Sequence, residues 1–225
     1  MTVSFDSKNT VALSTANPTT MGFTCGTKCT LLVLHVIDGA NASPGGTPTF
    51  NSVNMSKVGG TVIGVAEVAS ELWYLYKPNT GANYVIGMPN ANGDNLRLYA
   101  SSYVSSVNSS LVLSVNTSTN VTVGSPSLTL TSTTADSVFV DVYGTGNTSP
   151  GKLPSGFILI NSADEGIWST MCAYKLLTSA STVTDRWPIA SDDVAFILAN
   201  FGETLAPATS PALVGDFESY SFCME

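Results

Sequence analysis

The fold class is decided by the stretch Glu67-Val-Ala-Ser-Glu-Leu-Trp-Tyr-Leu-Tyr-Lys-Pro-Asn-Thr-Gly-Ala-Asn-Tyr-Val-Ile-Gly-Met88. Two runs rich in aromatic and apolar residues flank the joint Lys77-Pro-Asn-Thr-Gly-Ala82, and such runs are typical of strands. The joint has turn chemistry, because proline fixes one φ angle and glycine accepts a positive one. Leu72, Tyr74 and Tyr76 are expected to face the core, whereas the alternate face is mixed. The stretch predicts a β-hairpin at the centre of an all-β domain.

The rest of the chain repeats this pattern of short strands and turns. Leu31–Ile37 is apolar on both alternating faces, which predicts a central strand covered on each side. Ser137–Tyr143 alternates strictly, so its three valines are expected on one face. Turn signals recur about every 8–12 residues, as in sandwiches and jelly rolls. We therefore predict an all-β fold, a two-sheet β-sandwich of jelly-roll type, formed by residues 1–205.

The composition changes near Leu205, where two prolines among small residues indicate an extended segment. We predict a C-terminal arm over residues 206–225 that carries Phe217, Tyr220 and Phe222. Two interpretations of this arm stay open. It packs on its own domain, or it docks on a neighbouring subunit in the manner of an added strand.

The charge balance excludes some classes of partner. Charged residues make up only 11% of the 225 residues, against roughly a quarter in an average soluble protein. The net charge is −8, so the chain lacks the basic surface that binds nucleic acid or an anionic membrane. The longest apolar run is too short to span a bilayer, and the N-terminus does not resemble a signal peptide. We expect synthesis in the cytoplasm, or export as part of something larger.

Four cysteines leave several chemistries open: Cys25, Cys29, Cys172 and Cys223. The spacing of Cys25 and Cys29 suits half of a zinc site, but no second pair completes it. Four cysteines would allow three disulfide connectivities, and without secretory targeting we favour reduced thiols.

Catalytic chemistry has little support in the sequence. His35 is the only histidine and lies in the most apolar strand, which favours a structural role over a nucleophilic triad. The adjacent carboxylates Asp164-Glu165 and Asp192-Asp193 fall beside turns. Neighbouring strand residues point to opposite faces, so neither pair forms an acid–base couple alone. Turn and cap chemistry is the favoured interpretation.

Two binding chemistries have weaker support in the sequence. The segment Asn90–Asn95 is similar to a calcium loop but lacks the distal glutamate. Trp73, Trp168 and Trp187 would suit stacking on sugar rings, although core packing is the favoured role. We expect no cofactor.

Five segments, read in order, resemble a loose group of β-sandwich virion proteins of tailed bacteriophages. The resemblance covers about residues 30–205, and its motifs are strands and turns. The segments are Thr49-Phe-Asn-Ser-Val-Asn-Met-Ser-Lys-Val-Gly59, Glu71-Leu-Trp-Tyr-Leu75, Lys77-Pro-Asn-Thr-Gly81, Ala100-Ser-Ser-Tyr-Val-Ser-Ser-Val107 and Asp193-Val-Ala-Phe-Ile-Leu-Ala-Asn-Phe201. Ser52 and Ser106 replace glycines usual in the group, and Lys77 replaces a common asparagine, so these turns are expected to differ in geometry.

The resemblance implies a non-enzymatic structural protein of the virion, such as a capsid decoration protein or a head or tail fibre component. Its expected partners are further copies of itself, with a trimer as the natural state, and other virion proteins such as the major capsid protein. The expected contacts lie in the aromatic arm and in two loops rich in glycine and proline, residues 38–48 around Pro44 and residues 144–156 around Pro150. The alternatives are a carbohydrate-binding adhesin that takes a host surface glycan and, with less support, a glycan hydrolase.

Overall fold

The computed structural model describes residues 3–40, 42–64, 68–105, 111–119, 126–146, 151–166, 168–188 and 193–203. Within these ranges the regular structure is all β-strand, which confirms the predicted all-β class. The strands in chain order are β1 (Val3–Ser14), β2 (Thr19–Cys25), β3 (Cys29–Asp38), β4 (Thr49–Phe50), β5 (Val53–Asn54), β6 (Ser56–Ile63), β7 (Ala69–Tyr76), β8 (Gly81–Met88), β9 (Leu96–Ser105), β10 (Leu111–Thr119), β11 (Ser127–Thr131), β12 (Ser137–Thr145), β13 (Ile158–Asp164), β14 (Ser169–Leu177), β15 (Thr182–Arg186) and β16 (Val194–Glu203).

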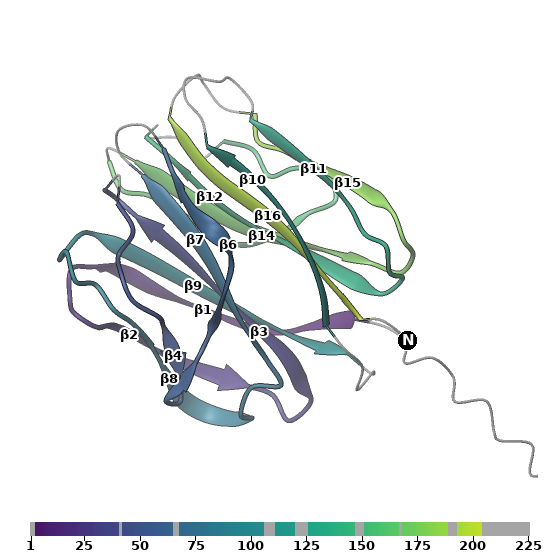
Figure 1. Cartoon of the computed structure of the whole chain (residues 1–225), viewed down its shortest axis with the longest axis horizontal. Coiled ribbons are helices and arrows are strands. Elements are labelled where there is room, and N and C mark those ends of the chain that lie inside the picture. The colour runs from purple at the N-terminus through teal and green to yellow at the C-terminus, as the bar shows by residue number, and fades with distance from the viewer. Residues whose placement is uncertain are drawn as a thin grey trace, which may run out of the picture.

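The described strands form four antiparallel sheets stacked in layers (Figure 1). Two five-stranded sheets occupy the middle, with the orders β1-β9-β3-β7-β6 and β10-β16-β12-β14-β13. The sheet β2-β8-β4-β5 covers the outer face of the first, and the two-stranded ribbon β11-β15 covers the outer face of the second. The molecule is thus a β-sandwich, but the two sheets predicted from the sequence are joined by two further ones.

The strand Leu31–Ile37 has the central position that its composition predicted. It lies within β3, the middle strand of the first five-stranded sheet, and is buried on both faces. Alternate residues enter the central core between the two five-stranded sheets and the outer core beneath β2-β8-β4-β5. In β12, Val138, Val140 and Val142 all enter the central core, as their alternation predicted. Apolar side chains on both faces mark a strand that sheets cover from both sides.

The predicted hairpin across residues 67–88 is wrong. β7 pairs with β3 and β6, whereas β8 pairs with β2 and β4 in another sheet. The turn residues are correctly placed, since Lys77 and Gly81 have φ angles of 50° and 147°. They end β7 and carry the chain across to the outer sheet, because β7 already has a partner on each side. Turn chemistry therefore gave the position of the break but not the partner of the next strand.

The second half of the chain repeats the topology of the first. We call β1–β9 the first lobe and β10–β16 the second lobe. The order β1-β9-β3-β7-β6 corresponds strand for strand to β10-β16-β12-β14-β13, and the outer pair β2-β8 corresponds to β11-β15. The registers agree as well, because Asp38 pairs with Ala69 and Leu96 while Thr145 pairs with Ser169 and Val194.

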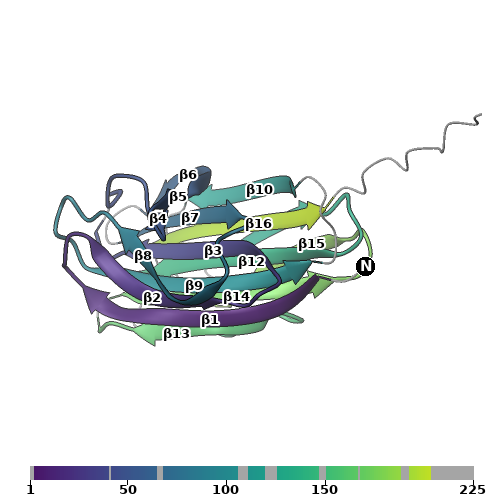
Figure 2. The same ribbon diagram turned by 90° about the horizontal axis from the view of Figure 1, so that it is seen from below.

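The two lobes pack as an approximate two-fold pair around the central core. Ile37, at the end of β3, lies beside Gly144 at the end of β12, so the two strands run in the same direction. Lys8 in β1 donates to the carbonyl oxygen of Ile160 in β13 at 2.6 Å along one edge, while β6 packs on β10 along the other (Figure 2). This arrangement corresponds to a two-fold axis parallel to the strands.

Candidate functional site at the loop end

The two loops expected to make contacts begin at the same end of the molecule. β3 leads into residues 39–48 and β12 into residues 146–156, and the ends of these strands lie side by side. In the first loop Pro44 is buried, and its carbonyl oxygen accepts a hydrogen bond from Ala91 N at 3.1 Å. Pro150 and the arm residues Phe217, Tyr220 and Phe222 lie outside the described residues. These contact residues remain predictions.

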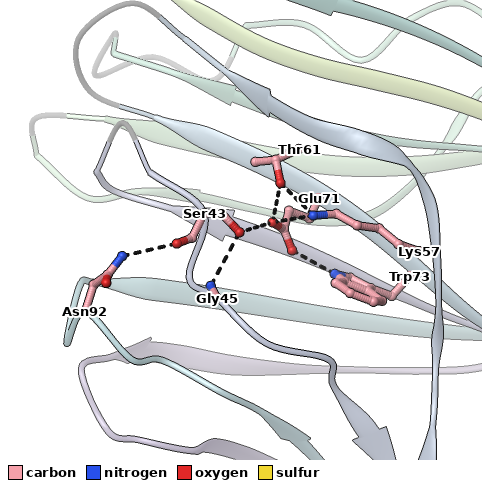
Figure 3. Close-up of polar contacts among 7 residues, drawn as sticks. All are labelled: Ser43, Gly45, Lys57, Thr61, Glu71, Trp73 and Asn92. Carbon is pink, nitrogen blue, oxygen red and sulfur yellow. Dashed lines mark hydrogen bonds and ion pairs between the residues drawn. The ribbon is translucent and has the colours of Figure 1, made fainter.

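A buried carboxylate anchors the first loop (Figure 3). Glu71 in β7 is 1% exposed, and its Oε1 accepts hydrogen bonds from Ser43 Oγ at 2.6 Å and Thr61 Oγ1 at 2.6 Å. Lys57 Nζ forms an ion pair with the same oxygen at 2.8 Å. Oε2 accepts a hydrogen bond from Trp73 Nε1 at 2.8 Å. Both oxygens of Glu71 are thus occupied, and one side chain ties the loop to β6 and β7.

These donors decide the charge state of Glu71. Burial alone would raise the pKa of Glu71, but hydrogen bonds from Lys57, Ser43 and Thr61 outweigh it and lower that pKa. A buried carboxylate with a cation and neutral donors stays ionised, and hydrogen bonds to an ionised group are stronger than neutral ones. Lys57 Nζ also lies 5.1 Å from the centre of the Trp73 ring, so Trp73 contacts both charges. The cluster is a structural anchor with its hydrogen-bonding capacity used internally.

A second set of contacts joins the loop to residues 90–95. Asn92 Nδ2 donates to the carbonyl oxygen of Ser43 at 3.1 Å (Figure 3), and Gly39 N donates to the carbonyl oxygen of Asn95 at 2.9 Å. Asp38 is fully buried beside this junction, where Ala40 N donates to its Oδ1 at 3.0 Å. Burial, with the charge of Asp94 in addition, raises the pKa of Asp38 to about 7. The loop end therefore carries one firmly ionised carboxylate and one that titrates near neutral pH.

The asparagine-rich segment over residues 90–95 forms the predicted turn. Asn90 Nδ2 closes it with a hydrogen bond to the carbonyl oxygen of Asp94 at 2.8 Å. Among the described residues no group of three or more histidine, cysteine, aspartate or glutamate side chains converges to hold a metal ion. The calcium interpretation gains no support from this geometry.

His35 has the structural role that the sequence favoured. It is fully buried, with Nδ1 at 2.7 Å from the carbonyl oxygen of Asp141 and Nε2 at 3.2 Å from Ser101 Oγ. Burial lowers the pKa of His35 to about 4, so the ring is neutral at pH 7. The neighbour that orients the ring is a main-chain carbonyl and not the carboxylate of a triad, and Ser101 is buried as well. The pair joins β3 and β9 to β12.

The cysteines of the described residues are reduced thiols, in agreement with the favoured interpretation. Cys25, Cys29 and Cys172 are free and buried, and Cys223 lies outside the described residues. Cys25 and Cys29 share a hydrogen bond, which raises the pKa of Cys25 and lowers that of Cys29.

The carboxylates beside turns and the tryptophans also follow the structural interpretation. Asp164 Oδ1 accepts a hydrogen bond from Gly166 N at 2.8 Å, and Glu165 forms an ion pair with Arg97. Asp192 lies outside the described residues. The exposed fractions of Trp73, Trp168 and Trp187 are 6%, 2% and 0%, respectively, so these rings pack in the cores and do not present a face to a sugar.

A shallow groove of about 420 Å³ lies on the outer sheet of the first lobe. Uncharged polar side chains dominate its walls, and Tyr84 and Val85 supply apolar surface. Its lining residues include Thr20, Thr49, Asn51, Ser52 and Asn83. The groove offers hydroxyl and amide groups, and its lining contains no carboxylate, histidine, lysine or arginine, so it suits binding of a neutral ligand.

Comparison with protein-family models, with characterised proteins and with solved structures finds no match to this chain. Within the described ranges, no helix has the length and apolar character needed to cross a membrane.

Proposed function

We propose that the chain is a non-enzymatic structural protein of a bacteriophage particle, which acts through contacts with further copies of itself and with other virion proteins. The arrangement of its two loops carries this proposal. The loops of both lobes begin side by side at one end of a body with a continuous core. Such a body would present both loops to the same neighbouring subunit or virion protein.

The polar chemistry of the described residues supports the same conclusion. The buried histidine, the anchoring glutamate and the turn carboxylates have internal partners. An enzyme would need reactive groups that converge on an accessible cleft. A decoration protein or a fibre component needs a rigid body and surfaces complementary to its neighbours, and the core shared by the two lobes supports the first of these requirements.

We also interpret the first lobe as a jelly roll. In the first lobe, β1, β2, β3 and β4 alternate between the five-stranded and the outer sheet, and so do β7, β8 and β9. The resulting sheets contain β1-β9-β3-β7 and β2-β8-β4-β5, an interleaved order that supports the jelly-roll connectivity. Jelly rolls are frequent in viral coat proteins, so this interpretation agrees with a place in the virion.

Binding to assembled particles tests the proposal. Purified chain is mixed with capsids and tails prepared from a phage mutant that lacks it, and the particles are sedimented. We expect the chain to sediment with the capsids, in a fixed ratio to the major capsid protein. Leu153 is 40% exposed in the second loop, and Leu153→Asp is expected to reduce binding at least tenfold. Ile158→Asp, a matched change at a 51% exposed residue on β13, should leave binding unchanged. Failure of the chain to bind either particle contradicts the proposal.

A carbohydrate-binding adhesin is the second candidate, and the groove on the outer sheet is the observation that favours it. Its threonine, serine and asparagine side chains match the hydroxyl groups of a neutral glycan. A glycan array tests this alternative, with Asn83→Ala and Tyr84→Ala as variants. Selective glycan binding that both variants abolish would favour the adhesin.

A further inference from the structure

Two aspartates are buried against each other inside the second lobe. Asp141 in β12 and Asp185 in β15 are both 0% exposed, and both side chains enter the core between the five-stranded sheet and the β11-β15 ribbon, close enough for each to shift the pKa of the other. Asp141 Oδ1 accepts a hydrogen bond from Ala173 N. Asp141 Oδ2 and both carboxyl oxygens of Asp185 have no protein donor. The indole N–H of Trp187 lies toward Asp185 without completing a hydrogen bond.

The first lobe serves as an internal reference for this pair. Asp38 corresponds to Thr145 by register, so Leu34 occupies the position equivalent to Asp141. The equivalent of Asp185 follows from the strands on either side of β8 and β15 in the chain. Equivalent residues differ by 100 in number between β7 and β14 and by 98 between β9 and β16. An intermediate difference of 99, together with the buried alternation of β8 and β15, pairs Ile86 with Asp185.

Leu34 and Ile86 are fully buried in the outer core of the first lobe. The same position in the fold thus holds two aliphatic side chains in one lobe and two carboxyl groups in the other. The fold itself does not require the acids there.

Two ionised carboxylates in contact cannot both remain in an apolar core, because each destabilises the other and neither is solvated. One proton held between them supplies the missing donor and removes one charge. The charged and titratable groups around the pair are few. Lys175 on β14 interacts with Asp185, while Cys172 on β14 and Tyr103 on β9 interact with Asp141. His35 contacts Asp141 only at its main-chain oxygen. None of these replaces the shared proton.

We propose that Asp141 and Asp185 form a proton-dependent latch that holds the β11-β15 ribbon against the core of the second lobe. Asp185 is the acid that ionises near neutral pH, because burial raises its pKa to about 7, whereas Asp141 keeps its proton well above that pH. Ionisation of Asp185 places a buried charge between the sheet and the ribbon and weakens the latch. Opening of the ribbon then exposes the apolar face beneath it, which includes Phe139, Tyr143 and Phe196. The latch does not depend on the proposed place of the chain in a virion.

Hydrogen exchange of the intact chain tests the latch. Amide protection in β11 and β15 is measured at about pH 6 and about pH 8, with the intrinsic rates divided out. A group with a pKa of about 7 in the closed state and an ordinary value in the open state changes the opening equilibrium about tenfold over this interval. We expect protection in the ribbon to fall by about that factor. Protection in the equivalent strands β2 and β8, where the positions are aliphatic, should not change.

Two variants separate the latch from a general effect of pH. Asp141→Leu together with Asp185→Ile introduces the pair of the first lobe, and Asp185→Asn keeps the shape while supplying a permanent donor. Each is expected to give ribbon protection that is the same at both pH values. The Asp185→Asn variant keeps the test valid if the double variant does not fold. Equal protection of the wild-type ribbon at both pH values, or a pH effect that persists in the variants, would overturn the proposal.

Discussion

Glu71 holds the first loop in place through contacts to three segments. Its carboxylate meets Ser43 in the loop, Lys57 and Thr61 in β6, and Trp73 in β7. We expect Glu71→Gln to lower the free energy of unfolding by about 2 kcal/mol, because charge-assisted hydrogen bonds are lost and an amide NH₂ faces a donor. Urea unfolding at pH 7 measures the change.

Asp164→Asn is the matched control for Glu71→Gln. It removes one carboxylate charge at an exposed turn and keeps the acceptor for Gly166. We expect a change within about 0.5 kcal/mol. Equal effects of the two variants would contradict the anchoring role of Glu71.

Because of His35, the free energy of unfolding depends on pH in the acidic range. Its folded pKa is about 4, below the ordinary value of about 6.5, so its contribution is complete above pH 6.5 and is lost as the pH falls toward 4. The shift corresponds to about 3 kcal/mol at full burial. The raised pKa values of Asp38 and Asp185 act in the opposite direction over this range. The difference between wild type and His35→Asn therefore isolates the histidine.

Urea unfolding between about pH 4 and pH 7 gives this difference, which should narrow as the pH falls. NMR of the ring protons checks the cause directly. An imidazole that titrates near its ordinary pKa in the folded chain would contradict this account.

The roles of some single residues were predictable from the sequence, and those of others were not. The burial of His35 was predictable, because a polar residue inside a run of aliphatic residues is usually hydrogen-bonded in a core. The anchoring by Glu71 was not predictable, since its donors come from the loop and from β6, which only the pairing of strands brings close. The Asp141–Asp185 pair was missed, although an aspartate in the alternating strand Ser137–Tyr143 was a signal for it.

At the scale of elements, the junction of the two lobes depends on a close approach. A Cβ atom added to Gly39, after β3, would lie 2.7 Å from the Trp168 ring that precedes β14. We expect Gly39→Ala to lower the free energy of unfolding by about 1–3 kcal/mol, because the buried ring must shift. Thermal unfolding measures the effect. Gly22→Ala, which meets no atom within 4 Å, should cost less than about 1 kcal/mol, and equal costs would refute the close approach.

Strand positions were largely predictable and strand partners were not. The apolar composition of Leu31–Ile37 placed it in the middle of a sheet, and the alternation of Ser137–Tyr143 placed its valines on one face. Both patterns arise from local contacts with the covering sheets. The partner of β8 depends on which sheet the chain joins after the turn at Lys77, and turn residues carry no information on that. The predicted hairpin failed for this reason.

At the scale of the molecule, the two lobes share one core. Residues of both lobes make up the central cluster, among them Val33 and Tyr99 from the first lobe and Val140 and Ile197 from the second. We expect one cooperative unfolding transition in calorimetry, with equal calorimetric and van't Hoff enthalpies. Separate domains would give two transitions, and such a result would contradict the shared core.

A short sequence motif occurs in both lobes, directly after equivalent strands. Asn41-Ala-Ser-Pro-Gly45 and Asn147-Thr-Ser-Pro-Gly151 follow the equivalent strands β3 and β12. Few other positions match between the lobes, because a sandwich core accepts many combinations of apolar residues. The loop motif is therefore the main sequence signal of duplication, and it falls in the two loops that are expected to make contacts.

The solution mass of the purified full-length chain, measured by light scattering after size-exclusion chromatography, tests the central claim most directly. A protein that acts through subunit contacts is expected to form a stable oligomer, with three times the 23.4 kDa of one chain as the predicted mass. The same preparation is then mixed with assembled particles, which it should bind. A monodisperse monomer that does not bind to assembled particles but binds sugar would contradict the account.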